Sequence, residues 1–282
     1  MGFLLKQITV FLAFQLSISF SWARVLRLPP TEEKDLFFRG TLPDITTANR
    51  HDSVVLHCKV GGREPTIHWL KDGVRIQQGE SRDYRNDQAQ YEDTAAVTGK
   101  SFTASKLYLD CVDEASEGVY TCIGETPTER ITQSTNLVLK RPNADFLDLP
   151  EAAAEFSHRT CLEKRSVGNT AARIFLWTSL RLELMGEAVQ LFCRSEGSPS
   201  PQVEWFDNNR EKILPTSSEF SDYEILENGD LLIKRLQWKH MGQFKCSASN
   251  GEGSDTQGIF IYPMNGKMEV DEPTKARVLT AK

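Results

Sequence analysis

The chain has 282 residues, of which 39% are apolar and 26% are charged. This composition excludes a wholly disordered or fibrous protein, and the length predicts two domains of ordinary size. Acidic residues number 39 and basic residues 33, which gives a formal net charge of −6. Such an acidic balance does not suit binding to nucleic acid, and we expect no polyanionic partner.

The first 23 residues have the parts of a secretory signal. Lys6 is their only charged residue, an apolar run extends from residue 8 to residue 20, and small residues precede the expected cleavage after Ala23. An uncleaved anchor is the alternative, but the run is shorter than the roughly 18 apolar residues that span a bilayer. Because no later stretch is apolar enough for membrane insertion, we expect a secreted, extracellular protein.

The part of the chain after the leader shows a pattern of cysteine and tryptophan typical of an immunoglobulin sandwich. Cys58 precedes Trp69 by 11 residues, and Tyr120 stands two residues before Cys122. In such a domain one disulfide joins the two sheets, a tryptophan packs against it, and a tyrosine bonds back to the backbone. Apolar residues alternate with polar ones from 53 to 60, which turns Cys58 toward the core. We therefore pair Cys58 with Cys122.

A second copy of the pattern follows. Cys193 precedes Trp205 by 12 residues, and Phe244 stands two residues before Cys246, where the first copy has tyrosine. Cys193 is therefore paired with Cys246. The predicted fold is all-β, with two tandem immunoglobulin-like antiparallel β-sandwiches of the I-set type.

The remaining cysteines are Cys111 and Cys161. Alignment of the two copies places Cys111 just after the fifth strand of the first sandwich, and Cys161 lies in the segment between the domains. That segment leaves the first sandwich at the end where Cys111 lies, so a bridge between them is geometrically natural. The alternative is an intermolecular bond that gives a covalent dimer.

The pattern also divides the chain into segments. In order, these are a signal peptide (1–23), an N-terminal lead-in (24–45), the first immunoglobulin-like domain (46–140), a linker (141–172), the second domain (173–263) and a polar tail (264–282). The first domain carries a polar excess within 77–105, which contains Tyr84 and Tyr91. Loops on a rigid sandwich often bind partners, so these tyrosines are candidate interface residues, although a solvated insertion without a role is equally compatible.

The sequence does not indicate a catalytic site or a metal site. His57 and His68 are the most suggestive histidines, but their strands belong to opposite sheets and both side chains point outward, so they do not converge on one ion. No nucleophile elbow, phosphate loop or dinucleotide motif is present. We expect a binding protein that is not an enzyme and holds no cofactor or metal. The chain has no Asn-Xaa-Ser/Thr site, so we expect no N-linked glycan.

Two tryptophans lie outside the core positions. Trp177 and Trp238, with Phe175, Phe260 and Tyr262, would form an apolar patch on the second domain that binds a partner. The alternative is structural, because Trp238 would cover the end of the sandwich and Trp177 would pack beneath the linker.

The second domain resembles a known family. The resemblance rests on Leu184-Met185-Gly186, Asn228-Gly229-Asp230 with the leucines that follow, Cys246 to Asn250, and Phe260-Ile261-Tyr262-Pro263. These segments are similar to the nematode zwei Ig secreted proteins and to the secreted two-immunoglobulin antagonist of insulin-like peptides in insects. The extra cysteine with a partner in the linker resembles the nematode members.

The resemblance implies a function that spacing and periodicity do not. The nematode branch implies an extracellular recognition or adhesion protein that maintains axon position and nervous-system architecture through protein contacts. The insect branch implies a soluble binding protein for insulin-like peptides, which is the alternative. A purely structural spacer of the extracellular matrix is a third hypothesis. No binding residue of the family is carried over to this sequence.

Overall fold

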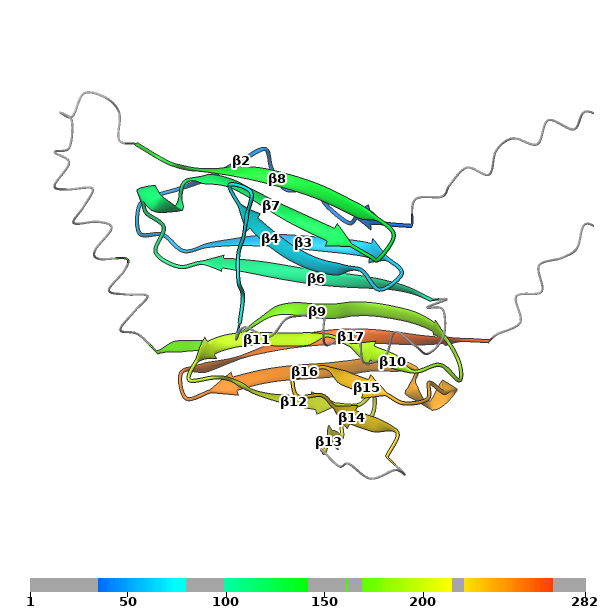
Figure 1. The fold of residues 1–282 in the computed structure, drawn as a ribbon. Helices are drawn as coiled ribbons and strands as arrows, with labels where there is room; N and C mark the ends of the chain where they lie inside the picture. Colours follow the sequence, from blue (N-terminus) through cyan, green and yellow to red (C-terminus); the bar gives the residue numbers. More distant parts are fainter. Residues whose placement is uncertain (1–34, 80–98, 142–160, 162–168, 215–220, 266–282) are drawn as a thin grey trace, which may run out of the picture. The chain divides into compact units, whose positions relative to one another are not determined.

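The computed structural model describes residues 35–79, 99–141, 161, 169–214 and 221–265 (Figure 1). All of these described residues belong to one compact unit. The expected signal peptide, Tyr84, Tyr91, most of the linker and the tail after residue 265 lie outside the described residues. No helix in the described ranges is long and apolar enough to cross a membrane.

The first sandwich has two sheets. One sheet consists of β1 (Phe37–Phe38), β3 (Val54–Gly62) and β6 (Lys100–Leu109). The facing sheet consists of β2 (Ile45–Ala48), β8 (Arg130–Leu139), β7 (Gly118–Glu125), β4 (Thr66–Lys71) and β5 (Val74–Arg75). A single 3-10 turn, η1 (Glu114–Ser116), precedes β7. Strand β1 lies within the stretch assigned to the lead-in and pairs with β3.

The core of the first sandwich forms around its disulfide and tryptophan. Trp69 is fully buried, and its indole Nε1 donates a hydrogen bond to the Ser105 Oγ over 3.0 Å. The Tyr120 hydroxyl donates to the backbone oxygen of Ser116 over 2.8 Å, which is the hydrogen bond of a tyrosine corner. The polar atoms of both aromatic residues are therefore satisfied inside an apolar core.

The second sandwich repeats this arrangement. One sheet contains β9 (Thr170–Leu184), β17 (Gly253–Met264), β16 (Gly242–Asn250), β12 (Gln202–Phe206) and β13 (Lys212–Ile213), with β11 (Cys193–Ser198) paired to β9. The facing sheet contains β10 (Val189–Leu191), β15 (Leu231–Ile233) and β14 (Tyr223–Ile225), and η2 (Trp238–His240) precedes β16. The prediction of an all-β fold with two immunoglobulin sandwiches is confirmed.

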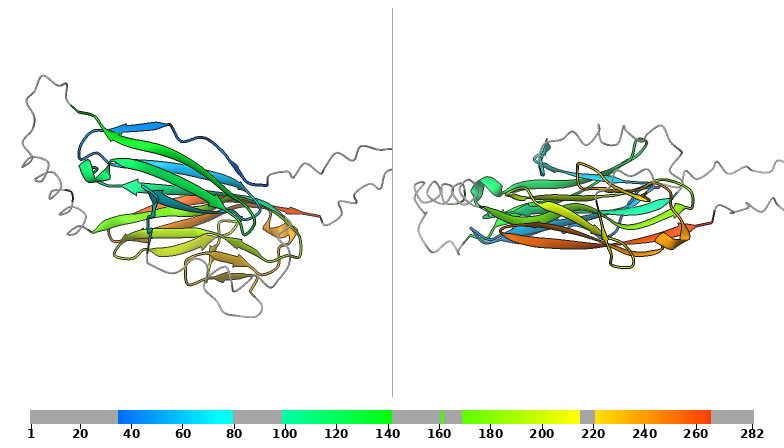
Figure 2. Two further views of the ribbon diagram at one scale, coloured as in Figure 1. Left: turned by 45° about the horizontal axis from the view of Figure 1, so that its top comes forward. Right: turned by 90° about the horizontal axis from the view of Figure 1, so that it is seen from below.

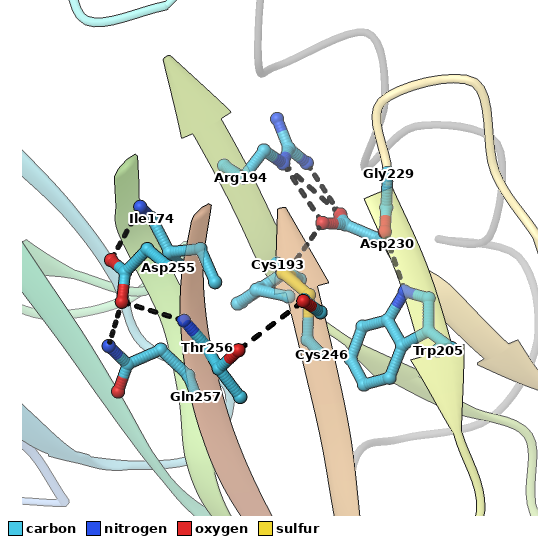
Figure 3. The surroundings of a disulfide bond; sticks show 12 residues. Ile174, Cys193, Arg194, Trp205, Gly229, Asp230, Cys246, Asp255, Thr256 and Gln257 are labelled. Carbon is cyan, nitrogen blue, oxygen red and sulfur yellow. Dashed lines mark hydrogen bonds and ion pairs between the residues drawn. A yellow bond between two sulfur atoms is a disulfide. The ribbon is translucent and has the colours of Figure 1, made fainter. Parts of the chain in front are cut away.

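The second core differs from the first in its polar contacts (Figure 3). Trp205 is fully buried and donates through its Nε1 to the Gly229 backbone oxygen over 2.8 Å. Phe244 is also fully buried and packs edge-on against Tyr223, with 6.1 Å between the ring centroids. Beside the disulfide, Arg194 forms an ion pair with the fully buried Asp230 over 2.8 Å.

All six cysteines are paired. The disulfides join Cys58 to Cys122, Cys193 to Cys246, and Cys111 to Cys161, which are the pairs favoured by the sequence. The third bridge connects two side chains that are only 5% and 0% exposed, with 5.4 Å between the Cα atoms. It anchors a point of the interdomain segment to the first sandwich.

The two sandwiches share one continuous sheet, a feature that the sequence did not indicate. Strand β6 of the first sandwich pairs antiparallel with β9 of the second, and the two strands lie side by side in Figure 1 and Figure 2. Strand β9 is 15 residues long, so its first part pairs with β11 while its last part pairs with β17. Both of these strands lie along one edge of β9, and the backbone groups on its opposite edge pair with β6. The domains are therefore joined by backbone hydrogen bonds as well as by the linker.

Candidate protein-binding face

The shared sheet brings apolar side chains from both domains onto one face. Paired residues on neighbouring strands point to the same side of a sheet. The register aligns Phe37 of β1 with Gly61 of β3, then Phe102 of β6, Leu180 of β9 and Phe260 of β17. One row of positions therefore crosses five strands and both sandwiches.

This face points to solvent. Phe260 is 43% exposed, whereas Ile259 and Ile261 on either side of it are fully buried. Next to Phe260 along β17, Tyr262 meets Trp238 of η2 edge-on, with 6.1 Å between the ring centroids. We name the exposed and half-buried side chains of this surface the apolar stripe, which consists of Phe37, Phe102, Leu180, Phe260, Tyr262 and Trp238.

A glycine makes the first-domain end of the stripe possible. The rings of Phe37 and Phe102 meet edge-on above Gly61, with 5.7 Å between their centroids. A Cβ atom at Gly61 would lie 2.5 Å from the Phe37 ring and 2.7 Å from the Phe102 ring, well inside van der Waals contact. The absence of a side chain at this position therefore allows two strands that flank β3 to place their aromatic rings together.

Basic side chains border the stripe on the first sandwich. The Arg39 guanidinium lies 5.2 Å and the Lys59 ammonium 5.6 Å from the centroid of the Phe102 ring, and the Lys106 ammonium lies 5.3 Å from the Trp177 ring. These distances are those of cation–π contacts. Three cations are thus held above two aromatic rings.

A hollow of about 310 Å³ lies beside these cations. Its lining includes Arg39, His57, Lys59, Ala104 and Trp177, and we call it the cationic pocket. Lys106 does not line it but lies over the ring of Trp177, which does. Ala104 is the register partner of both Lys59 and Trp177, and its small side chain leaves the space that the larger neighbours surround.

Burial and neighbouring positive charges lower the pKa values of two basic groups that line the pocket. Burial lowers the pKa of Lys59 below its usual range, and the nearby Arg39 lowers it further. Burial likewise lowers the pKa of His57, with an additional contribution from Lys106. In both cases the like charge disfavours the protonated form.

Ion pairs cross the boundary between the two domains. Arg181 of β9 is 2% exposed and binds the carboxylates of Glu64 and Glu183, each over 2.6 Å. Arg173 binds Asp110 of the first sandwich, also over 2.6 Å. Both contacts join β9 to the first sandwich across the shared sheet.

A second hollow, of about 650 Å³, lies at the same domain boundary, and its lining includes Gly79, Asp110, Arg173 and Glu196. Its charges compensate one another, since Arg173 is paired with Asp110 and Glu196 accepts a hydrogen bond from the Gly79 backbone. Burial raises the pKa of Glu196, while Arg173 opposes that rise. Within the described ranges, the cations that line the cationic pocket have no such compensation by a carboxylate.

The predicted interface residues do not form one cluster. Trp238 lies in the apolar stripe with Tyr262 and is 54% exposed, whereas Trp177 lines the cationic pocket. Phe175 is 4% exposed and packs with the core of the first sandwich, so it does not belong to an exposed patch. The sequence gives no sign that Phe37, Phe102 and Leu180 belong to this surface, because only the pairing of β6 with β9 brings them beside Phe260.

His57 lies on β3 and His68 on β4, which belong to opposite sheets. Among the residues that the structure describes, no group of three histidine, cysteine or acidic side chains is placed to hold a metal ion.

The fold and the exposed face define a tandem immunoglobulin protein of the binding class. The immunoglobulin domain family matches the chain twice, over residues 41–125 and 176–250. The chain is 30% identical to neural/ectodermal development factor IMP-L2 of Drosophila melanogaster over 205 residues, which covers 73% of this chain and 67% of that protein. It is 27% identical to zwei Ig domain protein zig-2 of Caenorhabditis elegans over 236 residues, or 80% of this chain and 84% of that protein.

A solved structure supports the same grouping. The crystal structure of IMP-L2 matches with a TM-score of 0.57 and 25% identity, and covers 82% of this chain and 96% of that one. The chain therefore belongs to the immunoglobulin-domain family, in the group of two-domain proteins that contains IMP-L2 and the zwei Ig proteins. The resemblance seen in the sequence is confirmed. These comparisons support extracellular binding through the immunoglobulin domains.

Proposed function

We propose that this chain is a secreted recognition protein that binds a protein partner through the apolar stripe, and that it acts in maintaining axon position and nervous-system architecture. The observation that carries the proposal is the stripe itself, which crosses five strands in register and contains four residues between 42% and 54% exposed. Contiguous exposed apolar surface on a soluble protein is typical of a protein-binding site.

The dimensions and composition of the stripe suit this role. Neighbouring strands lie about 4.8 Å apart, so five strands give a row about 19 Å long. Tryptophan, tyrosine and phenylalanine supply large contact areas and are frequent among the residues that dominate binding energy. The neural part of the proposal is supported by the relatives, one of which is named a neural/ectodermal development factor.

Substitutions in the stripe test the proposal without disturbing the core. Phe260→Ser and Trp238→Ser change side chains that are 43% and 54% exposed, so both variants are expected to fold. If these residues are binding hot spots worth about 2 kcal/mol, each variant binds neuronal surfaces roughly 30-fold more weakly. Val74→Ser is the matched control, because Val74 is 71% exposed on β5, outside the shared sheet. Unchanged binding by both stripe variants would refute the proposal.

A soluble binding protein for an insulin-like peptide is the second candidate. The continuous character of the stripe favours it, because a small folded hormone can cover a row about 19 Å long without a second binding surface. Titration of the purified chain with insulin-like peptides separates the two functions. Saturable nanomolar binding that Phe260→Ser weakens would favour the hormone carrier, and its absence would favour recognition at the cell surface.

A further inference from the structure

The cations beside the apolar stripe differ from others at the domain boundary. Arg173 and Arg181 are each paired with carboxylates over 2.6 Å. In contrast, Arg39, Lys59 and Lys106 form no ion pair with any acidic residue in the described ranges. Three neighbouring cations without a carboxylate are unexpected in a chain with a net charge of −6.

Their contacts leave hydrogen-bond donors available. A cation–π contact is made with the face of an aromatic ring and satisfies no specific N–H group. The Lys59 and Lys106 ammonium groups each carry three N–H donors, and the Arg39 guanidinium carries five. The rings of Phe102 and Trp177 therefore hold the cations in place while their donors remain able to bind an anion.

We propose that the cationic pocket binds a carboxylate of an acidic segment in the protein partner that docks on the apolar stripe. This inference rests on the proposed function. It specifies the chemistry of the partner, which should carry an apolar surface flanked by glutamate or aspartate. Charge-assisted hydrogen bonds from ammonium and guanidinium groups to a carboxylate are short and strong, and a partner carboxylate would relieve the repulsion among the three cations.

Two observations favour an acidic protein over a sulfated polysaccharide. The pocket is a local hollow of about 310 Å³ adjoining apolar side chains, which suits a single anionic group next to hydrophobic residues. A long polyanion would instead extend over a surface whose overall charge is negative. Binding to a polysaccharide is therefore an outcome that would contradict the proposal.

The first test uses a short peptide of alternating glutamate and leucine, with a glutamine-for-glutamate peptide as its control. Fluorescence anisotropy measures the affinity of the full mature chain for each. The double variant Lys59→Gln/Lys106→Gln should bind the acidic peptide about tenfold more weakly or worse, because two charged donors are lost. Lys59→Arg/Lys106→Arg should retain binding, since it keeps both charges.

A matched variant controls for simple loss of charge. Lys245 lies 4.3 Å from the centroid of the Phe206 ring on β12, and neither residue lines the cationic pocket, so Lys245→Gln should leave affinity for the peptide unchanged. An equal loss in Lys245→Gln would contradict a specific pocket. Binding of the peptide by the wild-type chain should weaken between about 50 mM and about 500 mM salt, because salt screens exposed ionic contacts. Binding that is independent of salt would also contradict a specific pocket.

The second test separates failure of this inference from failure of the proposed function. Binding to neuronal surfaces is compared for Phe260→Ser, for Lys59→Gln/Lys106→Gln and for the wild type, with and without a heparin oligosaccharide as competitor. Loss in both variants supports the inference. Loss only in Phe260→Ser leaves the stripe as a docking face and overturns the acidic partner. Competition by heparin that depends on Lys59 and Lys106 would also overturn it in favour of a sulfated ligand.

Discussion

The carboxylate of Asp230 offers a quantitative test of the second core (Figure 3). Asp230 is fully buried, and it accepts hydrogen bonds from the Cys193 backbone N–H over 3.0 Å and from Arg194 at two nitrogens over 2.8 and 3.1 Å. Gln190 donates to it over 2.9 Å. Asp230→Ala would remove this carboxylate from beside the largely buried Arg194, and removal of one partner of a buried pair costs about 3–5 kcal/mol.

A double variant distinguishes the cost of removing one partner alone from the value of the whole ion pair. Arg194→Met/Asp230→Leu removes both charges and replaces them with apolar side chains, so it should recover most of the stability lost in Asp230→Ala. Urea unfolding followed by tryptophan fluorescence measures both variants. A loss below about 1 kcal/mol in Asp230→Ala, or a double variant no more stable than the single one, would refute this account of the pair.

Three further outcomes are expected. Gly61→Val should displace the rings of Phe37 and Phe102, and so lower both the melting temperature and the affinity for the partner, measured by calorimetry and cell binding. Burial lowers the pKa of His240, so the folded chain binds fewer protons than the unfolded one, and the free energy of unfolding should decrease as the pH falls below 6.5. The variant His240→Phe should show a weaker pH dependence in urea titrations from pH 5 to 7.5. Removal of the third disulfide, with serine at both cysteines, should cost about 4 kcal/mol on the loop-entropy estimate for its 50-residue separation. An unchanged unfolding free energy would contradict the anchoring of the linker.

Local sequence patterns were sufficient for much of the fold. The alternation around Cys58 fixes which side chains enter the core, because a strand exposes every second residue to one face. The spacing from Cys58 to Trp69 and from Cys193 to Trp205 then identifies two sandwiches, since each tryptophan must reach its disulfide from the next strand. These constraints act within one domain and over short distances, so they can be recognised in the sequence.

The candidate binding face required the tertiary structure. Phe102 and Phe260 are separated by more than half of the chain, and neither belongs to a motif. They share a row only because β6 pairs with β9, a pairing of backbone groups that leaves no specific signature in the side chains. The ion pair of Arg194 with Asp230 was missed for a similar reason, since the sequence does not show which arginine meets which carboxylate.

The sequence by itself therefore determined the two sandwiches and favoured the disulfide pairs that close them, because alternation and cysteine spacing are local consequences of strand geometry. Only the tertiary structure decided that the domains share a sheet and that an apolar stripe crosses both of them. It also decided that Arg39 and Lys59 line one pocket, with Lys106 over the ring of Trp177, which lines it as well. These features arise from contacts between strands that are distant in the chain, and the order in which strands pair depends on the packing of the whole molecule.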